Sequence, residues 1–145
     1  MTSTQEFTEF AQAVSPRLLR TAFLLCGDWH TSEDLAQATL AKVYASWRRV
    51  SQQPVAQAYA TRILVNTYLA ALATLPAKSR AVVVLRYWGD LSVDQVAEVL
   101  GCSAGNVKSQ SARALDKLRA VLGEAMTGVP AAPSPKPREK GTLRQ

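Results

Sequence analysis

Apolar residues recur at intervals of three and four along most of this chain, and that spacing limits what it can fold into. Such intervals place side chains on one face of an α-helix, whereas a half-buried strand alternates apolar and polar residues. The apolar, β-branched run from Val82 to Trp88 has no second strand to pair with, and a lone strand is not stable. The sequence therefore predicts an all-α fold. The first expected helix carries the apolar stripe Phe7, Phe10, Ala11, Val14, Leu18, Ala22 and Leu25.

Turn and capping residues divide this pattern into separate helices. Gly27 ends the first helix, and Thr31 with Asp34 has the spacing of a capping box for a second helix that runs to about residue 48. A third helix follows a polar loop, and Pro76 breaks or restarts the chain after it. Trp47 and Trp88 are expected in the core.

A short helix, a glycine-containing turn and a second helix predict a helix-turn-helix in the C-terminal third. Ser92 and Gln95 form a capping box, Gly101 suits a left-handed helix end, and Ser103 suits the start of the next helix. The second helix turns a polar and cationic row outward: Ser103, Asn106, Lys108, Ser109 and Arg113. An αα-hairpin in a bundle would explain the apolar residues but not this row. The row favours a helix that enters the major groove of DNA.

Composition excludes most enzymes and metal proteins. Two cysteines, Cys26 and Cys102, and one histidine, His30, cannot supply a disulfide framework or a four-ligand zinc site. No phosphate-binding glycine loop is present, so we expect no catalytic residue, no metal and no cofactor. No window approaches the roughly 20 apolar residues of a membrane helix, which predicts no membrane insertion. The N-terminus lacks a secretion signal, and the expected location is cytoplasmic.

The positive charge is concentrated toward the C-terminus. Half of the formal net charge of +6 lies in residues 127–145, which hold four Lys or Arg against one Glu. Four prolines interrupt that stretch, and a segment of this composition cannot pack a core. It is predicted to be a disordered basic tail.

Three segments resemble the bacterial extracytoplasmic-function sigma factors of RNA polymerase, and the third is similar to the sigma-E-like group of actinobacteria. They are SEDLAQATLAKVYASW (32–47), AYATRILVNTYL (58–69) and LPAKSRAVVVLRYWGDLSVDQVAEVLGCSAGNVKSQSARALDKLR (75–119). The resemblance implies two small helical domains, region 2 at residues 1–70 and region 4 at 71–126, before the tail. It also implies binding to the clamp and flap regions of RNA polymerase core and to promoter DNA, and an anti-sigma factor as a further partner.

The resemblance also assigns roles to individual residues. Asp34, Gln37 and Thr39 fall on the helix that docks on the polymerase clamp, where Ala38 replaces a commonly acidic residue. The loop from Arg49 to Val55 matches the one that captures a flipped base of the −10 element, and the outward row of the helix-turn-helix reads the −35 element. The residues expected at the −10 element are Arg48, Arg49, Gln52, Gln53, Tyr59, Arg62 and Asn66.

The chain departs from the family in the connection between its two regions. Promoter elements roughly 16–18 base pairs apart are separated by about 55–60 Å of B-DNA. The stretch from Leu72 to Pro76 spans only about 18 Å when fully extended. Three explanations remain open. A disordered linker of the protein is left out of the sequence as given, the protein is an engineered or naturally shortened variant, or it is a regulator that keeps both folds and works differently. A stand-alone helix-turn-helix regulator and a helical protein that binds or mimics regulators of sigma factors are the alternatives.

Overall fold

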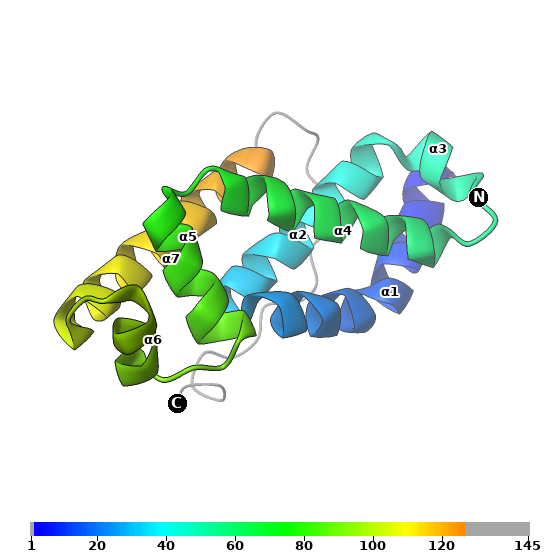
Figure 1. Cartoon of the computed structure of the whole chain (residues 1–145). Coiled ribbons are helices and arrows are strands. Elements are labelled where there is room, and N and C mark those ends of the chain that lie inside the picture. Colours follow the sequence, from blue (N-terminus) through cyan, green and yellow to red (C-terminus); the bar gives the residue numbers. More distant parts are fainter. Residues whose placement is uncertain (1, 127–145) are drawn as a thin grey trace, which may run out of the picture.

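The computed structural model of the protein describes residues 2–126, and all regular elements in that range are helices. This confirms the predicted all-α class, whereas the predicted tail lies outside the described residues. None of the described helices is long and apolar enough to cross a membrane. In chain order the elements are α1 (Ser3–Cys26), α2 (Trp29–Ala45), α3 (Trp47–Ser51), α4 (Ala56–Ala73), α5 (Ala77–Val83), the π-helix η1 (Val84–Trp88), α6 (Val93–Leu100) and α7 (Ala104–Met126) (Figure 1).

The junction between α1 and α2 is shorter than the sequence pattern suggested. Gly27 adopts the left-handed conformation with φ 68°, and Asp28 follows it in an extended conformation as the N-cap of α2. The Asp28 carboxylate accepts hydrogen bonds from the backbone N–H and the hydroxyl of Thr31, at 3.0 and 2.7 Å. The predicted Thr31–Asp34 capping box was therefore wrong, because aspartate is itself a strong N-cap and starts the helix earlier.

The predicted polar loop after α2 is partly helical. Ser46 ends α2 and precedes the short helix α3, which includes Val50 and Ser51. Val50 is fully buried, and this burial holds the turn of helix against α4. The non-helical loop between α3 and α4 is thus limited to residues 52–55.

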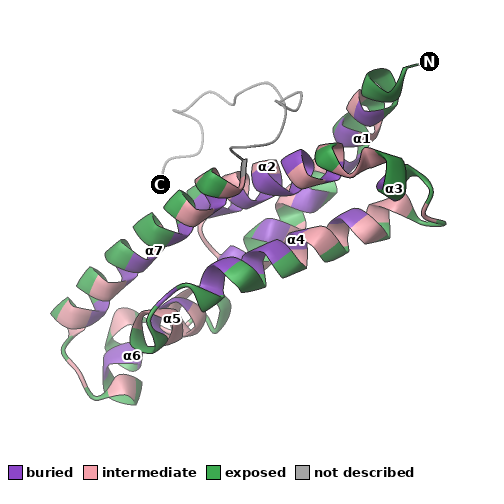
Figure 2. Cartoon of the chain, turned by 90° about the horizontal axis from the view of Figure 1, so that it is seen from above, coloured by how far each residue is buried: buried purple, intermediate pink, exposed green. Residues whose placement is uncertain are grey.

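One apolar core joins the two halves of the chain. The stripe predicted for α1 is confirmed: Phe7 and Leu18 are buried with Leu35 of α2 and Leu64 of α4. The same cluster contains residues from the C-terminal part of the chain, namely Val83, Ala114, Leu118 and Leu122. The second half of α7 therefore packs on α2 and α4, and Figure 2 shows buried residues along the sides of these helices.

A second, smaller core holds the helix-turn-helix together, as predicted. Val82 of α5, Val96 and Ala97 of α6 and Val107 of α7 are buried against one another. Gly101 ends α6 in the left-handed conformation with φ 68°. The Ser103 hydroxyl accepts a hydrogen bond from the Asn106 N–H at 3.0 Å and so caps α7.

Residues Val82 to Trp88 form a helix, as predicted, but its last turn is unusual. η1 widens the helix, and the Gly89 N–H donates to the Val84 carbonyl at 2.7 Å. Trp88 is 67% exposed, so the prediction that it lies in the core was wrong. The ring is outside because the change to π-helical spacing alters which residues face inward at this end. Trp47, by contrast, packs edge-on against Phe7, as expected.

Gly27 lies against the backbone of η1 and offers a test of this packing. A Cβ atom on Gly27 would lie 2.5 Å from the Tyr87 carbonyl oxygen, whereas a Cβ atom on Gly101, which has the same φ of 68°, would meet nothing within 4 Å. A left-handed conformation costs a non-glycine residue roughly 1–2 kcal/mol. Gly101→Ala should lose about that much unfolding free energy in denaturant titration, and Gly27→Ala should lose more, roughly 2–4 kcal/mol. Equal losses would contradict the close approach of α1 and η1.

Cys26 is buried at the end of α1, and this burial predicts a pH effect. Burial raises the pKa of the Cys26 thiol from 9.0 to about 12, and burial likewise raises the pKa of Tyr68. The folded chain therefore holds the Cys26 proton more tightly than the unfolded chain does. The resulting stability is fully present below about pH 9 and is lost as the pH rises toward 12.

We expect Cys26→Ala to make the free energy of unfolding fall less steeply between pH 9 and 12 than in the unsubstituted chain. The slopes should differ by up to about 1.4 kcal/mol per pH unit, since one proton is involved. Cys26→Ser, which fills the space without titrating in this range, is the control and should share the shallower slope. Identical slopes for all three chains, measured by denaturant unfolding, would show that the thiol is not desolvated.

Candidate functional site

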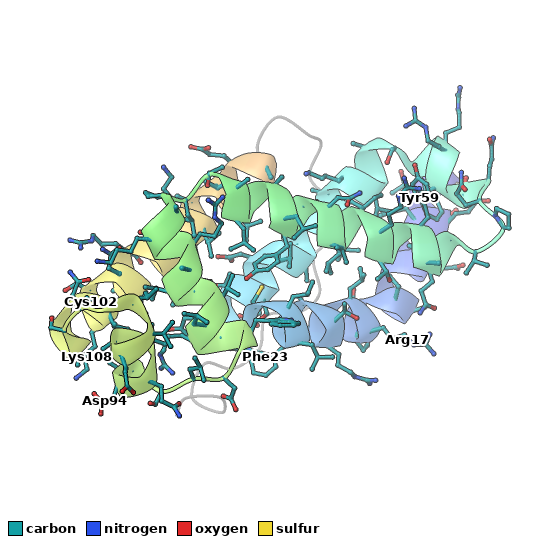
Figure 3. All side chains as sticks on the ribbon, in the orientation of Figure 1. Arg17, Phe23, Tyr59, Asp94, Cys102 and Lys108 are labelled. Carbon is teal, nitrogen blue, oxygen red and sulfur yellow. The ribbon has the colours of Figure 1, made fainter. Side chains whose placement is uncertain are left out.

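The first half of α7 presents the predicted DNA-reading row to solvent. Ser103, Lys108, Ser109 and Arg113 are exposed, and Asn106 is half-buried. In Figure 3, Lys108 lies at the end of the molecule formed by α6 and the start of α7. The structure thus brings the predicted row together on one accessible helix.

In two residues of this row, a side-chain polar atom is hydrogen-bonded or buried within the protein. The Ser103 oxygen already accepts the capping hydrogen bond from the Asn106 backbone. The Asn106 Oδ1 atom is buried and accepts no hydrogen bond from the described residues. Lys108, Ser109 and Arg113 are therefore the members of the row most open to a ligand.

Hydrogen bonds between elements hold this helix in place. The Ser79 hydroxyl of α5 donates to Gln110 Oε1 of α7 at 2.8 Å. Arg86 of η1 donates to the Leu91 carbonyl at 2.7 Å and so braces the loop that leads into α6. With the small core beneath, these contacts present the outward row on a rigid support.

The residues predicted for the −10 element lie on α3, on α4 and in the loop between them. Exposed Arg48, Arg49 and Gln52 line a shallow open depression together with Ala45 and Ser46. Arg62 and Asn66 are exposed and lie four residues apart, so they share one side of α4.

Two other residues predicted for the −10 element are less accessible. Tyr59 is half-buried and packs against the main core, at the α3 end of the molecule (Figure 3). Gln53 is half-buried, and its amide donates to the Arg49 carbonyl at 3.5 Å. Tyr59 therefore contributes to the packing of the main core, and only part of its side chain is accessible to DNA.

Of the three residues predicted to contact polymerase, the structure leaves two within reach of a partner. Asp34 and Gln37 are half-buried on α2. Thr39 is fully buried, and its hydroxyl donates to the Leu35 carbonyl at 2.8 Å. Thr39 is thus part of the core in this arrangement, because it lies on the opposite side of α2 from the surface.

Asp34 already has a partner within the chain. Arg119 of α7 donates from Nε to Asp34 Oδ2 at 2.9 Å, across a sequence separation of 85 residues. The hydrogen bond to Asp34 raises the pKa of the Arg119 guanidinium above its ordinary value. The sequence pattern assigned no role to Arg119. No local signal could have paired it with α2.

Nothing in the described part of the chain suggests a metal centre. No group of three or more His, Cys, Asp or Glu residues between positions 2 and 126 is arranged to hold an ion. His30 lies 4.0 Å from Glu33 on the first turn of α2, which is a surface contact within one helix. The site is therefore defined by its cationic and polar surfaces.

Models of two protein families match this chain. Sigma-70 region 2 matches residues 10–75, and sigma-70 region 4 matches residues 66–118. The first match covers most of α1 to α4 and the second contains the helix-turn-helix. Because the matches overlap at residues 66–75, no residues of this chain lie between them.

Relatives of known name include two Streptomyces proteins. The RNA polymerase sigma-E factor of Streptomyces coelicolor is 32% identical, with 81% of this chain and 86% of that protein aligned. The sigma-E factor of Streptomyces antibioticus is also 32% identical, with 81% and 84% aligned. Among solved structures, the sigma factor RpoE in complex with the anti-sigma factor NepR from Bartonella quintana matches with a TM-score of 0.43 at 22% identity, covering 82% of this chain and 98% of that one.

The alignment with the S. coelicolor protein is longer than the part of this chain that it contains. It is 152 positions long, yet 81% of the 145 residues of this chain amounts to only about 117 residues. About 35 positions, the difference between 152 and 117, therefore face gaps in this chain. The printed sequence is continuous from α4 to α5 across residues 74–76.

Proposed function

Because this chain belongs to the sigma-70 family of RNA polymerase sigma factors, we propose that it binds polymerase core through α2 and promoter DNA through α7 and α3–α4. It acts by binding, without a catalytic step of its own, and it works in the cytoplasm, where the polymerase is. The observation that carries this proposal is the exposed polar row on the first half of α7, held rigid by its own small core.

The −35 element is read by the start of α7. Lys108, Ser109 and Arg113 stand on the exposed side of the helix, while Val107 and Ala114 are buried beneath it. A recognition helix places its N-terminal residues at base edges in the major groove and its cations near phosphates. Polar side chains near the N-terminus and a cation one to two turns later satisfy both requirements.

The −10 element is held by α3, α4 and the loop between them. The depression lined by Arg48, Arg49 and Gln52 has a cationic rim and an amide, which suit a single-stranded base and its phosphate. Unstacking a base costs a few kcal/mol, which contacts in such a pocket offset. Arg62 and Asn66 continue this polar surface along α4.

Polymerase core docks on α2 through Gln37 and Asp34, and region 4 contributes the contact with the flap. Both α2 side chains are half-buried, so each has an accessible part beside a well-packed helix. The fully buried residues Leu35 and Ala38 flank them and fix the helix on α1 and α4. An anti-sigma factor that covers the same surface is the further partner that this proposal includes.

A stand-alone helix-turn-helix regulator is the second candidate, and one observation favours it. Residues 74–76 alone connect α4 to α5, and Leu75 among them is buried. Promoter elements lie roughly 55–60 Å apart, and so short a connection leaves the two DNA-binding surfaces little freedom to move relative to each other. Stoichiometric copurification with polymerase core separates the candidates, since a simple regulator has no need of core.

Removing cations from α7 should weaken binding of −35 duplex DNA by the whole chain. Lys108→Ala and Arg113→Ala should each cost roughly 1–3 kcal/mol on specific sequences if the residue reads a base. A uniform loss with a lower salt slope would instead indicate a phosphate contact. The assay is fluorescence anisotropy at several salt concentrations.

Arg17→Ala is the matched control, because Arg17 is an exposed cation on α1, distant from Lys108 in Figure 3. It should leave affinity for the −35 duplex unchanged. If Lys108→Ala and Arg113→Ala behave like Arg17→Ala, α7 is not the reading helix.

The α2 surface is tested by a neutral substitution. Gln37→Ala should weaken binding of polymerase core by roughly three- to tenfold, in line with about 0.5–1.5 kcal/mol for a hydrogen bond. Gln12→Ala, on the exposed side of α1, is the control. If both variants bind immobilised core with equal affinity, Gln37 is not part of the docking surface.

A further inference from the structure

We propose that the second half of α7 is an intramolecular cover over the α2 surface, latched by Arg119 and Asp34, and that polymerase core must displace it. The inference rests on the proposed function, because it assumes that Asp34 and Gln37 form the docking surface. It adds a competition between two occupants of that surface: polymerase core and a helix of the same chain.

The latch lies at the edge of the contact between the helices. Arg119 Nε is 2.9 Å from Asp34 Oδ2, and the two side chains are 47% and 28% exposed. Such a pair is hydrated and individually weak, so it can open without a large penalty. It nevertheless uses the acidic group that a partner of α2 would need.

An apolar contact lies beneath the latch. Ala114, Leu118 and Leu122 are buried in the core that also contains Leu35 of α2 and Leu64 of α4. These α7 residues follow the DNA-reading row on the same helix. The front of α7 is therefore free for DNA while its rear contacts α2 and α4. Figure 2 shows the rear of α7 beside α2.

The short connection keeps the cover close to α2. Only residues 74–76 join α4 to α5. A short tether gives the rear of α7 a high effective concentration at α2. The close approach of Gly27 to the Tyr87 backbone is a second contact between the two halves.

The consequence is a conformational equilibrium that lowers the apparent affinity for core. If only a fraction of the chain is open, the apparent dissociation constant rises by the inverse of that fraction. Changes that weaken the contact between α7 and α2 should then increase core affinity, although they remove interactions from the free protein. A purely structural contact would produce no such gain.

Two variants of the full chain test the cover. Arg119→Ala should tighten core binding about two- to fivefold, the range expected when a weak surface ion pair is lost. Insertion of a 35-residue Gly/Ser linker between Ala73 and Thr74, both exposed, should tighten it further. The insertion should also enlarge the radius of gyration in small-angle X-ray scattering.

Each variant has a matched control. Lys117→Ala removes another exposed cation from the same helix and should leave core affinity unchanged. The same Gly/Ser segment added after Gln145 controls for added length. Unchanged or weaker core binding by Arg119→Ala and by the internal insertion would overturn the cover.

A further substitution separates the failure of the cover from failure of the proposed function. Gln37→Ala combined with the internal insertion should lose the affinity that the insertion gained. If Gln37→Ala weakens core binding but opening the chain does not strengthen it, the docking surface stands and the cover is wrong. If none of the chains binds core, both the proposed docking surface and the proposed cover are rejected.

Discussion

Burial of the rear half of α7 against α2 and α4 is the contact on which the rest of this structure depends. Leu118 and Leu122 are fully buried there, and each buried leucine contributes roughly 1.5–3 kcal/mol. Without that contact the helix-turn-helix would retain only its own small core around Val82, Val96 and Val107. The larger core thus anchors the helix whose other end carries the exposed polar row proposed to read DNA.

The exposed front and the buried rear of α7 belong to one helix, so they move together. The front of α7 faces solvent with Lys108 and Arg113, while its rear buries Leu118 against α2. A rigid helix transmits any displacement of its rear to its front. If α2 binds polymerase core and the front of α7 reads the −35 element, as we propose, a change at the contact between α2 and α7 therefore also changes the position of the reading residues.

Local sequence signals predicted the helix-turn-helix well. The capping box of Ser92, the left-handed Gly101 and the Ser103 cap involve interactions within a few residues, and all three are present. The prediction was wrong where two neighbouring residues could each cap a helix, and where tertiary packing determined which side chains are buried. Asp28 replaced Thr31 as the cap of α2, and Trp88 faces solvent after a π-helical turn.

The sequence by itself determined the helical class, the caps of α6 and α7 and the identity of the polar row on α7, because each depends on side chains three or four positions apart. The tertiary structure alone decided that Thr39 is buried and that Arg119 lies on Asp34. A pair separated by 85 residues is set by how the helices pack, and an amphipathic pattern shows which face is buried but not against which helix.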